Sequence, residues 1–127
     1  MKTSELMGPA LDWAVAKAAD YLSRQGNHWM VKLPYVSVRM NFVPGPRCVF
    51  TPSTRWAQGG PFIEQEKICL TRPRWDGQWT ALLVYEDRSF DGVASVEFDA
   101  PTPLVAAMRC YVQSRLGDEV EIPEELQ

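Results

Sequence analysis

The sequence is poor in the residues that bind metals and carry most nucleophilic catalysis. It has one histidine, His28, and three cysteines, Cys48, Cys69 and Cys110, which stand far apart along the chain. A zinc site needs three or four ligands of these types at short, regular spacings. An odd number of scattered cysteines also argues against a disulfide framework and favours reduced thiols. We therefore expect no metal, no cofactor and no cysteine–histidine nucleophile pair supported by spacing.

Long apolar runs and nucleotide-binding motifs are absent as well. No apolar run approaches the ~20 residues of a membrane span, and Met1–Glu5 lacks the apolar segment that opens a secretory signal. We therefore expect a cytoplasmic protein that does not engage a membrane. The sequence contains no Walker loop, no dinucleotide fingerprint and no nucleophile elbow. An enzyme stays open as an alternative, but no motif supports it.

The charges are unevenly distributed. Residues 24–74 carry eight basic residues against two acidic ones, Glu64 and Glu66, whereas residues 117–127 carry five acidic residues and no basic one. The middle of the chain could present a positive field to an anionic ligand. Alternatively, these charges scatter over both faces of a sheet and cancel. Because the net charge is −3 and the basic residues form no run, the pattern argues against nucleic acid as a partner.

Apolar residues at helical spacing predict two main helices. The first covers about residues 9–24, with Pro9 in its first turn. The second covers 103–116, with Thr102 as the N-cap and Gly117 as the stop.

Between the helices the pattern predicts antiparallel strands. Alternating residues mark strands over 36–42, 80–85 and 93–98, with weaker candidates at 29–33, 63–70 and 120–123 and a hairpin turn at Asp76-Gly77. We expect a single α+β domain over residues 1–127, with an acidic tail from about 118. Its antiparallel sheet of about 4–6 strands would pack with the two helices, which cover one face together or one face each.

The segment Ser53–Phe62 fits neither a helix nor a strand pattern. It packs hydroxyls, a guanidinium, an indole and an amide against Gly59, Gly60 and Pro61. Such a loop can turn backbone N–H groups and polar side chains toward one point. We interpret it as a ligand-binding loop, with these candidate residues: Ser53, Thr54, Arg55, Trp56, Gln58, Gly59, Gly60 and, from the second helix, Arg109.

Other residues admit two interpretations each. Five tryptophans is a high number for this length. Trp75 and Trp79, near Arg72 and Arg74, could stack on a base and hold a phosphate, or they could fill the core or a dimer interface. Glu64 and Glu66 would share one side of a strand, where they could do acid–base work or simply face solvent.

Three blocks of the chain resemble the P22 NinX-like proteins of phages and prophages. They are Met1–Leu6 with Leu11–Ala16, the loop Ser53–Pro61, and the ending from Thr102 through Arg109–Val112 to Leu116–Val120. The resemblance implies a phage origin and an α-β-α sandwich fold, but no mechanism. One position departs from the family, which usually has an acidic residue where Arg55 stands. If this position contacts the ligand, the present member would bind something more anionic.

Two functions remain in view. The first is a phage accessory protein that binds and sequesters a small anionic or nucleotide-type host molecule without catalysis, as a counter-defence. The alternative is an inhibitor or accessory factor that acts on a host enzyme through an exposed aromatic patch. A homodimer would suit either function, because a free edge strand and surplus tryptophans invite self-association.

Overall fold

The structure, a computed structural model, describes residues 1–25, 28–32, 37–39, 50–73, 75–87 and 92–127. Its elements are η1 (Thr3–Glu5), α1 (Gly8–Ala18), β1 (Leu22–Gln25), β2 (His28–Lys32), β3 (Ser37–Arg39), α2 (Trp56–Glu66), β4 (Cys69–Thr71), β5 (Trp79–Asp87), β6 (Gly92–Ala100), α3 (Pro103–Leu116) and η2 (Glu124–Leu126). The strands form two antiparallel sheets of three strands each, ordered β1-β2-β3 and β4-β5-β6. The predicted α+β class is confirmed, and the prediction of one sheet of about 4–6 strands is wrong.

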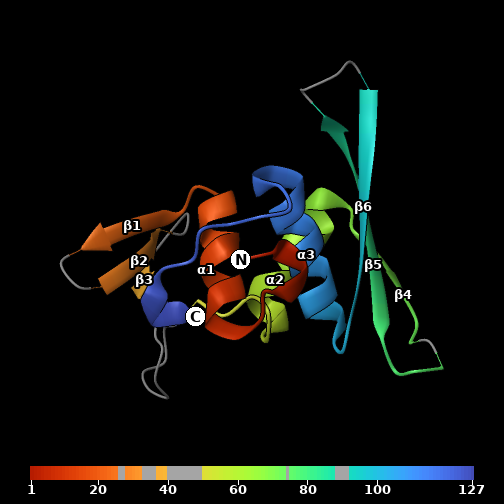
Figure 1. Cartoon of the computed structure of the whole chain (residues 1–127), viewed down its shortest axis with the longest axis horizontal. Helices are drawn as coiled ribbons and strands as arrows, with labels where there is room; N and C mark the ends of the chain where they lie inside the picture. Colours follow the sequence, from red (N-terminus) through yellow and green to blue (C-terminus); the bar gives the residue numbers. More distant parts are fainter. Residues whose placement is uncertain (26–27, 33–36, 40–49, 74, 88–91) are drawn as a thin grey trace.

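The three α-helices lie between the two sheets (Figure 1). This order of layers differs from the α-β-α sandwich that the resemblance implies, in which helices would cover both faces of one sheet. Helix α3 is enclosed in this arrangement, because every residue from Leu104 to Val112 is buried. A helix that is buried on all sides needs neighbours all around it, and here α1, α2, β5 and β6 supply them.

Helix α3 begins and ends where the sequence predicts. The Thr102 side chain accepts a hydrogen bond from the backbone N–H of Val105 at 3.2 Å, and Pro103 occupies the first helical position. Gly117 follows the last turn with a φ of 89°, a conformation that favours glycine.

Helix α1 is shorter than predicted, because it ends at Ala18 rather than at about residue 24. Asp20 adopts a left-handed conformation, with a φ of 60°, which aspartate tolerates better than most residues. The N–H groups of Asp20 and Tyr21 turn back to the carbonyls of Lys17 and Ala16, as in a Schellman end. The residues that follow pair with β2 as β1 instead of continuing the helix.

The sequence-based prediction is most in error for the segment that forms helix α2. The segment expected to be a loop and then a strand over 63–70 is helical from Trp56 to Glu66, and only Cys69–Thr71 is a strand. Phe62 explains why a segment with Gly-Gly-Pro becomes helical. Its buried ring lies 4.9 Å from that of Tyr111 and 6.5 Å from that of Phe50, measured between centroids. Tertiary packing thus overrides the weak helix propensity of the segment.

The other strand predictions have mixed outcomes. The turn at Asp76-Gly77 is confirmed, with Gly77 at a φ of 81° between β4 and β5. Strands β5 and β6 cover the predicted strands 80–85 and 93–98. Strand β2 matches most of the predicted 29–33, and β3 matches part of the predicted 36–42. The rest of these two predicted strands, residues 33, 36 and 40–42, lies outside the described residues. The strand expected over 120–123 is wrong: no strand covers these residues, and the nearest pairing is the single bridge of Glu119, just before them, with Lys2.

Replacing Gly59 with alanine should destabilise the protein. A Cβ at this position would lie 2.3 Å from the Pro52 carbonyl oxygen and 2.7 Å from Leu104 Cδ2, so the helix must shift, at a cost of about 1–3 kcal/mol. Chemical denaturation would measure this loss. The matched control is Gly60→Ala, whose Cβ meets nothing within 4 Å. We expect the control to stay within about 1 kcal/mol of wild type, because its gain in helix propensity opposes the restriction before Pro61. Equal effects of the two substitutions would contradict the close packing of α2.

Candidate functional site

The segment that leads into α2 is tied to the rest of the fold by two polar contacts. The backbone N–H of Ser53 donates to Oδ1 of Asp12, on α1, at 2.9 Å. The backbone N–H of Thr51 donates to Oε1 of Gln58, on α2, at 2.6 Å. These contacts fix the start of α2 relative to α1 and to the segment itself.

The predicted binding residues divide into an internal group and an exposed group. Ser53 and Gly59 are buried, and Gln58 supports the preceding segment through its contact with Thr51. These three residues serve the local structure. Thr54 and Arg55 are exposed, Gly60 is partly exposed, and Trp56 is 54% exposed although it is a large apolar side chain. The exposed polar and aromatic surface at the start of α2 therefore centres on Arg55 and Trp56.

The start of α2 has a positive electrostatic character. Its N-cap residue, Arg55, makes no capping hydrogen bond through its side chain, and the first turn contains no acidic residue. The N–H groups of Gln58 and Gly59 bond to the Arg55 carbonyl. Within the described part of the chain, the N–H groups of Trp56 and Ala57 have no protein acceptor. The helix dipole adds about half a positive charge at this end, beside the full charge of the guanidinium.

Arg109 lies elsewhere. It is 8% exposed, and burial lowers the pKa of its guanidinium. Its Nε donates to the Leu6 carbonyl at 2.9 Å and its Nη1 to the Asp99 carbonyl at 3.4 Å. Leu104, which faces α2 at Gly59, precedes Arg109 by five residues, so the two side chains leave α3 in different directions. Arg109 therefore joins the N-terminal segment to β6. Its hydrogen bonds are with Leu6 and Asp99, and neither Arg55 nor Trp56 takes part in them.

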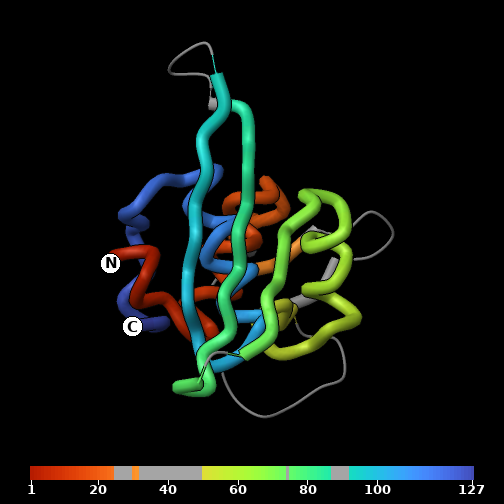
Figure 2. Tube along the Cα trace, turned by 90° about the vertical axis from the view of Figure 1, so that its right-hand side faces the viewer, coloured from red at the N-terminus to blue at the C-terminus, as the bar shows by residue number. Residues whose placement is uncertain are grey.

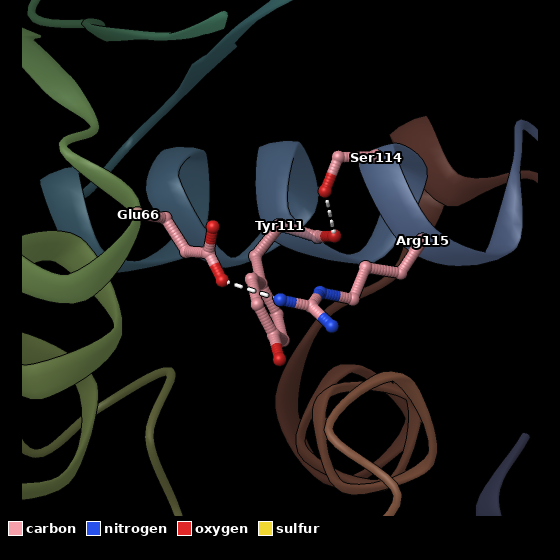
Figure 3. Close-up of polar contacts among 4 residues, drawn as sticks. All are labelled: Glu66, Tyr111, Ser114 and Arg115. Atoms are coloured by element: carbon pink, nitrogen blue, oxygen red, sulfur yellow. Dashed lines mark hydrogen bonds and ion pairs between the residues drawn. The ribbon is translucent and has the colours of Figure 1, made fainter. Parts of the chain in front are cut away.

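The glutamate pair does not form an acid–base site. Glu64 and Glu66 are on a helix, where residues two apart do not face each other. Oε1 of Glu66 instead lies 2.6 Å from a guanidinium nitrogen of Arg115, whose guanidinium also lies 5.1 Å from the ring centroid of Tyr111 (Figure 3). This contact ties the end of α2 to the end of α3.

The remaining candidates for chemistry are one buried thiol, one exposed thiol and two side chains that are not described. Burial raises the pKa of the Cys110 thiol to about 12, so it stays protonated. Cys69 is exposed on β4, while Cys48 and the His28 side chain lie outside the described residues. Among the side chains that the structure describes, no three histidines, cysteines or carboxylates gather to hold a metal.

Two of the tryptophans expected near a ligand differ in their surroundings. Trp75, in the turn between β4 and β5, is 94% exposed, whereas Trp79 is only partly exposed on β5. Arg72 is exposed, and Arg74 lies outside the residues that the structure describes. The turn therefore presents one isolated indole to solvent.

Comparison with known families adds the origin of the chain. The family model described as bacteriophage P22, NinX matches residues 2–115. The chain belongs to the NinX family. The matched range includes Asp12 and the segment from Ser53 to Gly60. Membership in the family supports a phage origin but gives no function. No curated protein matches the chain. No helix in its described ranges is long and apolar enough to cross a membrane.

The role of Asp12 does not follow from the helical pattern around it. Asp12 is 3% exposed, and burial raises its pKa to about 6, although the contacts with Ser53 act in the opposite direction. The sequence does carry one signal: Asp12 is the single polar residue in the run from Ala10 to Ala16. The structure buries this whole run.

Ionisation of Asp12 should make the protein less stable as the pH rises. Because its pKa in the folded protein is about 6 and the ordinary pKa of an aspartate is 3.8, the loss of stability is absent below about pH 4 and complete above about pH 6. A shift of this size corresponds to a loss on the order of 3 kcal/mol. Asp12→Asn keeps the oxygen that accepts from Ser53 and removes the charge. Denaturation of both proteins from pH 4 to pH 7 should show wild type losing stability relative to Asp12→Asn, and a constant difference would contradict the buried carboxyl.

Proposed function

We propose that this NinX-family protein is a phage accessory protein that binds a small anionic host molecule of nucleotide type, without catalysis, at the start of α2. The observation that carries the proposal is the pair Arg55 and Trp56, which are adjacent and exposed at a helix N-terminus with no acidic residue in its first turn.

Each component suits one part of such a ligand. A guanidinium can hold two oxygens of a phosphate at once, and the open N–H groups of a helix start accept an anion. An indole offers a flat face on which a base can stack. Arg55 and Trp56 stand on consecutive residues, so one ligand of nucleotide size would contact both.

The biological purpose would be sequestration. A phage protein that binds a host signalling nucleotide lowers its free concentration and thereby blunts a defence response in the cytoplasm of the infected cell. The departure at Arg55 fits this purpose, because a basic residue where the resembling proteins usually carry an acidic one selects for a more negative ligand.

Alanine substitutions of Arg55 and Trp56 should each abolish binding and leave the fold intact, because both side chains are exposed. Wild-type protein is first screened by thermal shift against mono-, di-, tri-, cyclic and oligonucleotides. A true ligand at about a thousand times its Kd should add about 4 kcal/mol of stability. Calorimetric titration of the best ligand then compares the variants.

The control is Trp75→Ala, which removes an equally large exposed indole from a different part of the surface. This variant should bind like wild type. Unchanged affinity in both Arg55→Ala and Trp56→Ala, or no stabilising nucleotide in the panel, would overturn the proposal.

A second candidate is an inhibitor of a host protein, and one observation favours it. Trp75 is 94% exposed, and exposed indoles are frequent energetic centres of protein interfaces. The turn that carries it is fixed by the hydrogen bond from the Gln78 backbone N–H to Oδ1 of Asp76, at 3.0 Å.

This alternative predicts that tagged wild-type protein retains one defined host protein from infected cells. Trp75→Ala should lose it, with a drop in affinity of at least tenfold, whereas Trp56→Ala should retain it. Biolayer interferometry with the purified partner would measure the difference. Equal retention by wild type and Trp75→Ala would exclude an interface at this turn.

A further inference from the structure

Strand β6 is a long edge strand whose protection is limited to the exposed carboxylates of Glu97 and Asp99. It pairs with β5 at nine consecutive positions, from Gly92 to Ala100, without a skipped residue. No other strand pairs with β6 in the part of the chain that the structure describes. Natural edge strands are commonly blunted by proline, lysine, a bulge or short length. Strand β4, the opposite edge, has three residues, but β6 has none of these four features.

The direction of the free backbone groups follows from one contact. The Asp99 carbonyl accepts a hydrogen bond from Arg109, so it points away from β5. In an antiparallel ladder, alternate residues direct both their N–H and C=O groups to the same side. Val93, Ser95 and Glu97 therefore direct theirs to the open edge as well, while Ala94 and Val96 bond to β5.

Among the residues that the structure describes, contacts cover only one end of this edge. At Asp99, Arg109 connects the strand to the Leu6 carbonyl beyond η1. The other end of the β5–β6 hairpin extends past the helices (Figures 1 and 2). There Val93 is 66% exposed and Val84, on β5, is 58% exposed. The accessible edge is therefore the segment Val93–Glu97.

We propose that Val93–Glu97 pairs in antiparallel fashion with the same segment of a second copy of this chain. A two-fold axis would pass beside Ser95, so that Ser95 faces Ser95 of the other copy and Val93 faces Glu97. The two three-stranded sheets would join into one continuous sheet of six strands, with six new backbone hydrogen bonds from the three outward-directed residues of each copy.

The charges of the strand favour a second copy in this register. The two Glu97 carboxylates would lie about 14 Å apart along the strands, and no like charges would face each other. A two-fold axis beside Glu97 would oppose the two carboxylates directly, which is unfavourable. It would also require the Asp99 carbonyl, which Arg109 already occupies. Pairing about Ser95 thus places no like charges opposite each other and has the two-fold symmetry of a homodimer interface.

The first experiment measures mass in solution. Sedimentation equilibrium of the wild-type chain should show a concentration-dependent species of twice the 14.4 kDa of one chain. Ser95→Pro removes an N–H directed to the open edge, where a proline is tolerated, and should weaken dimerisation at least tenfold. Ser95→Val keeps that N–H and serves as the matched control, which should dimerise like wild type. A monomeric wild type at high micromolar concentration, or an undiminished dimer of Ser95→Pro, would overturn the proposal.

The second experiment uses the unaltered protein and so does not depend on the folding of a variant. Hydrogen exchange followed by NMR should show the amides of Val93, Ser95 and Glu97 gaining protection as the protein concentration rises. The amides of Ala94 and Val96 should be protected at every concentration. If the three edge amides exchange rapidly throughout, or become protected only when a host protein is added, a second copy is not the occupant of this edge.

Discussion

The burial of α3 on all its sides is the constraint on which the rest of the structure depends. Nine consecutive residues of this helix, from Leu104 to Val112, are buried, and they include Arg109. All nine residues can be buried only if other elements surround the helix. Helices α1 and α2 pack on its flanks, and the β4-β5-β6 sheet packs beside it. Arg109 then lies where its guanidinium bonds to two backbone carbonyls. The burial of this helix accounts for the elements that enclose it, and the β1-β2-β3 sheet lies beyond α1 on the other side (Figure 1).

Contacts with α3 fix the position of helix α2. The ring of Phe62 packs against that of Tyr111, and Glu66 pairs with Arg115 (Figure 3). These two contacts attach the second half of α2 to α3. At its other end, Asp12 holds the preceding segment through Ser53. Because both ends are fixed, Arg55 and Trp56 project from a rigid helix start rather than from a loose loop. A site on a rigid element holds its side chains in place before a ligand arrives.

Much of the architecture follows from local signals. The N-cap at Thr102, the proline after it and Gly117 predict α3 to the residue, and the alternation in 80–85 and 93–98 predicts the β5–β6 hairpin. The composition of Ser53–Phe62 marks the segment as unusual. Its helical form was not predictable, because Gly59, Gly60 and Pro61 argue against a helix locally. Gly59 is present because α2 approaches Pro52 and Leu104 too closely for a Cβ, and this approach exists only in the folded protein.

The sequence by itself determined the α+β class, the bounds of α3, the turn at Asp76-Gly77 and, through its family, a phage origin. These properties depend on neighbours in the chain, such as caps, turn residues and hydrophobic periodicity. Tertiary structure alone decided that the strands separate into two sheets, that Asp12 and Ser53 meet, and that Arg109 turns to Leu6 and Asp99 instead of to α2. These outcomes depend on contacts between residues far apart in the chain, which a local pattern does not encode.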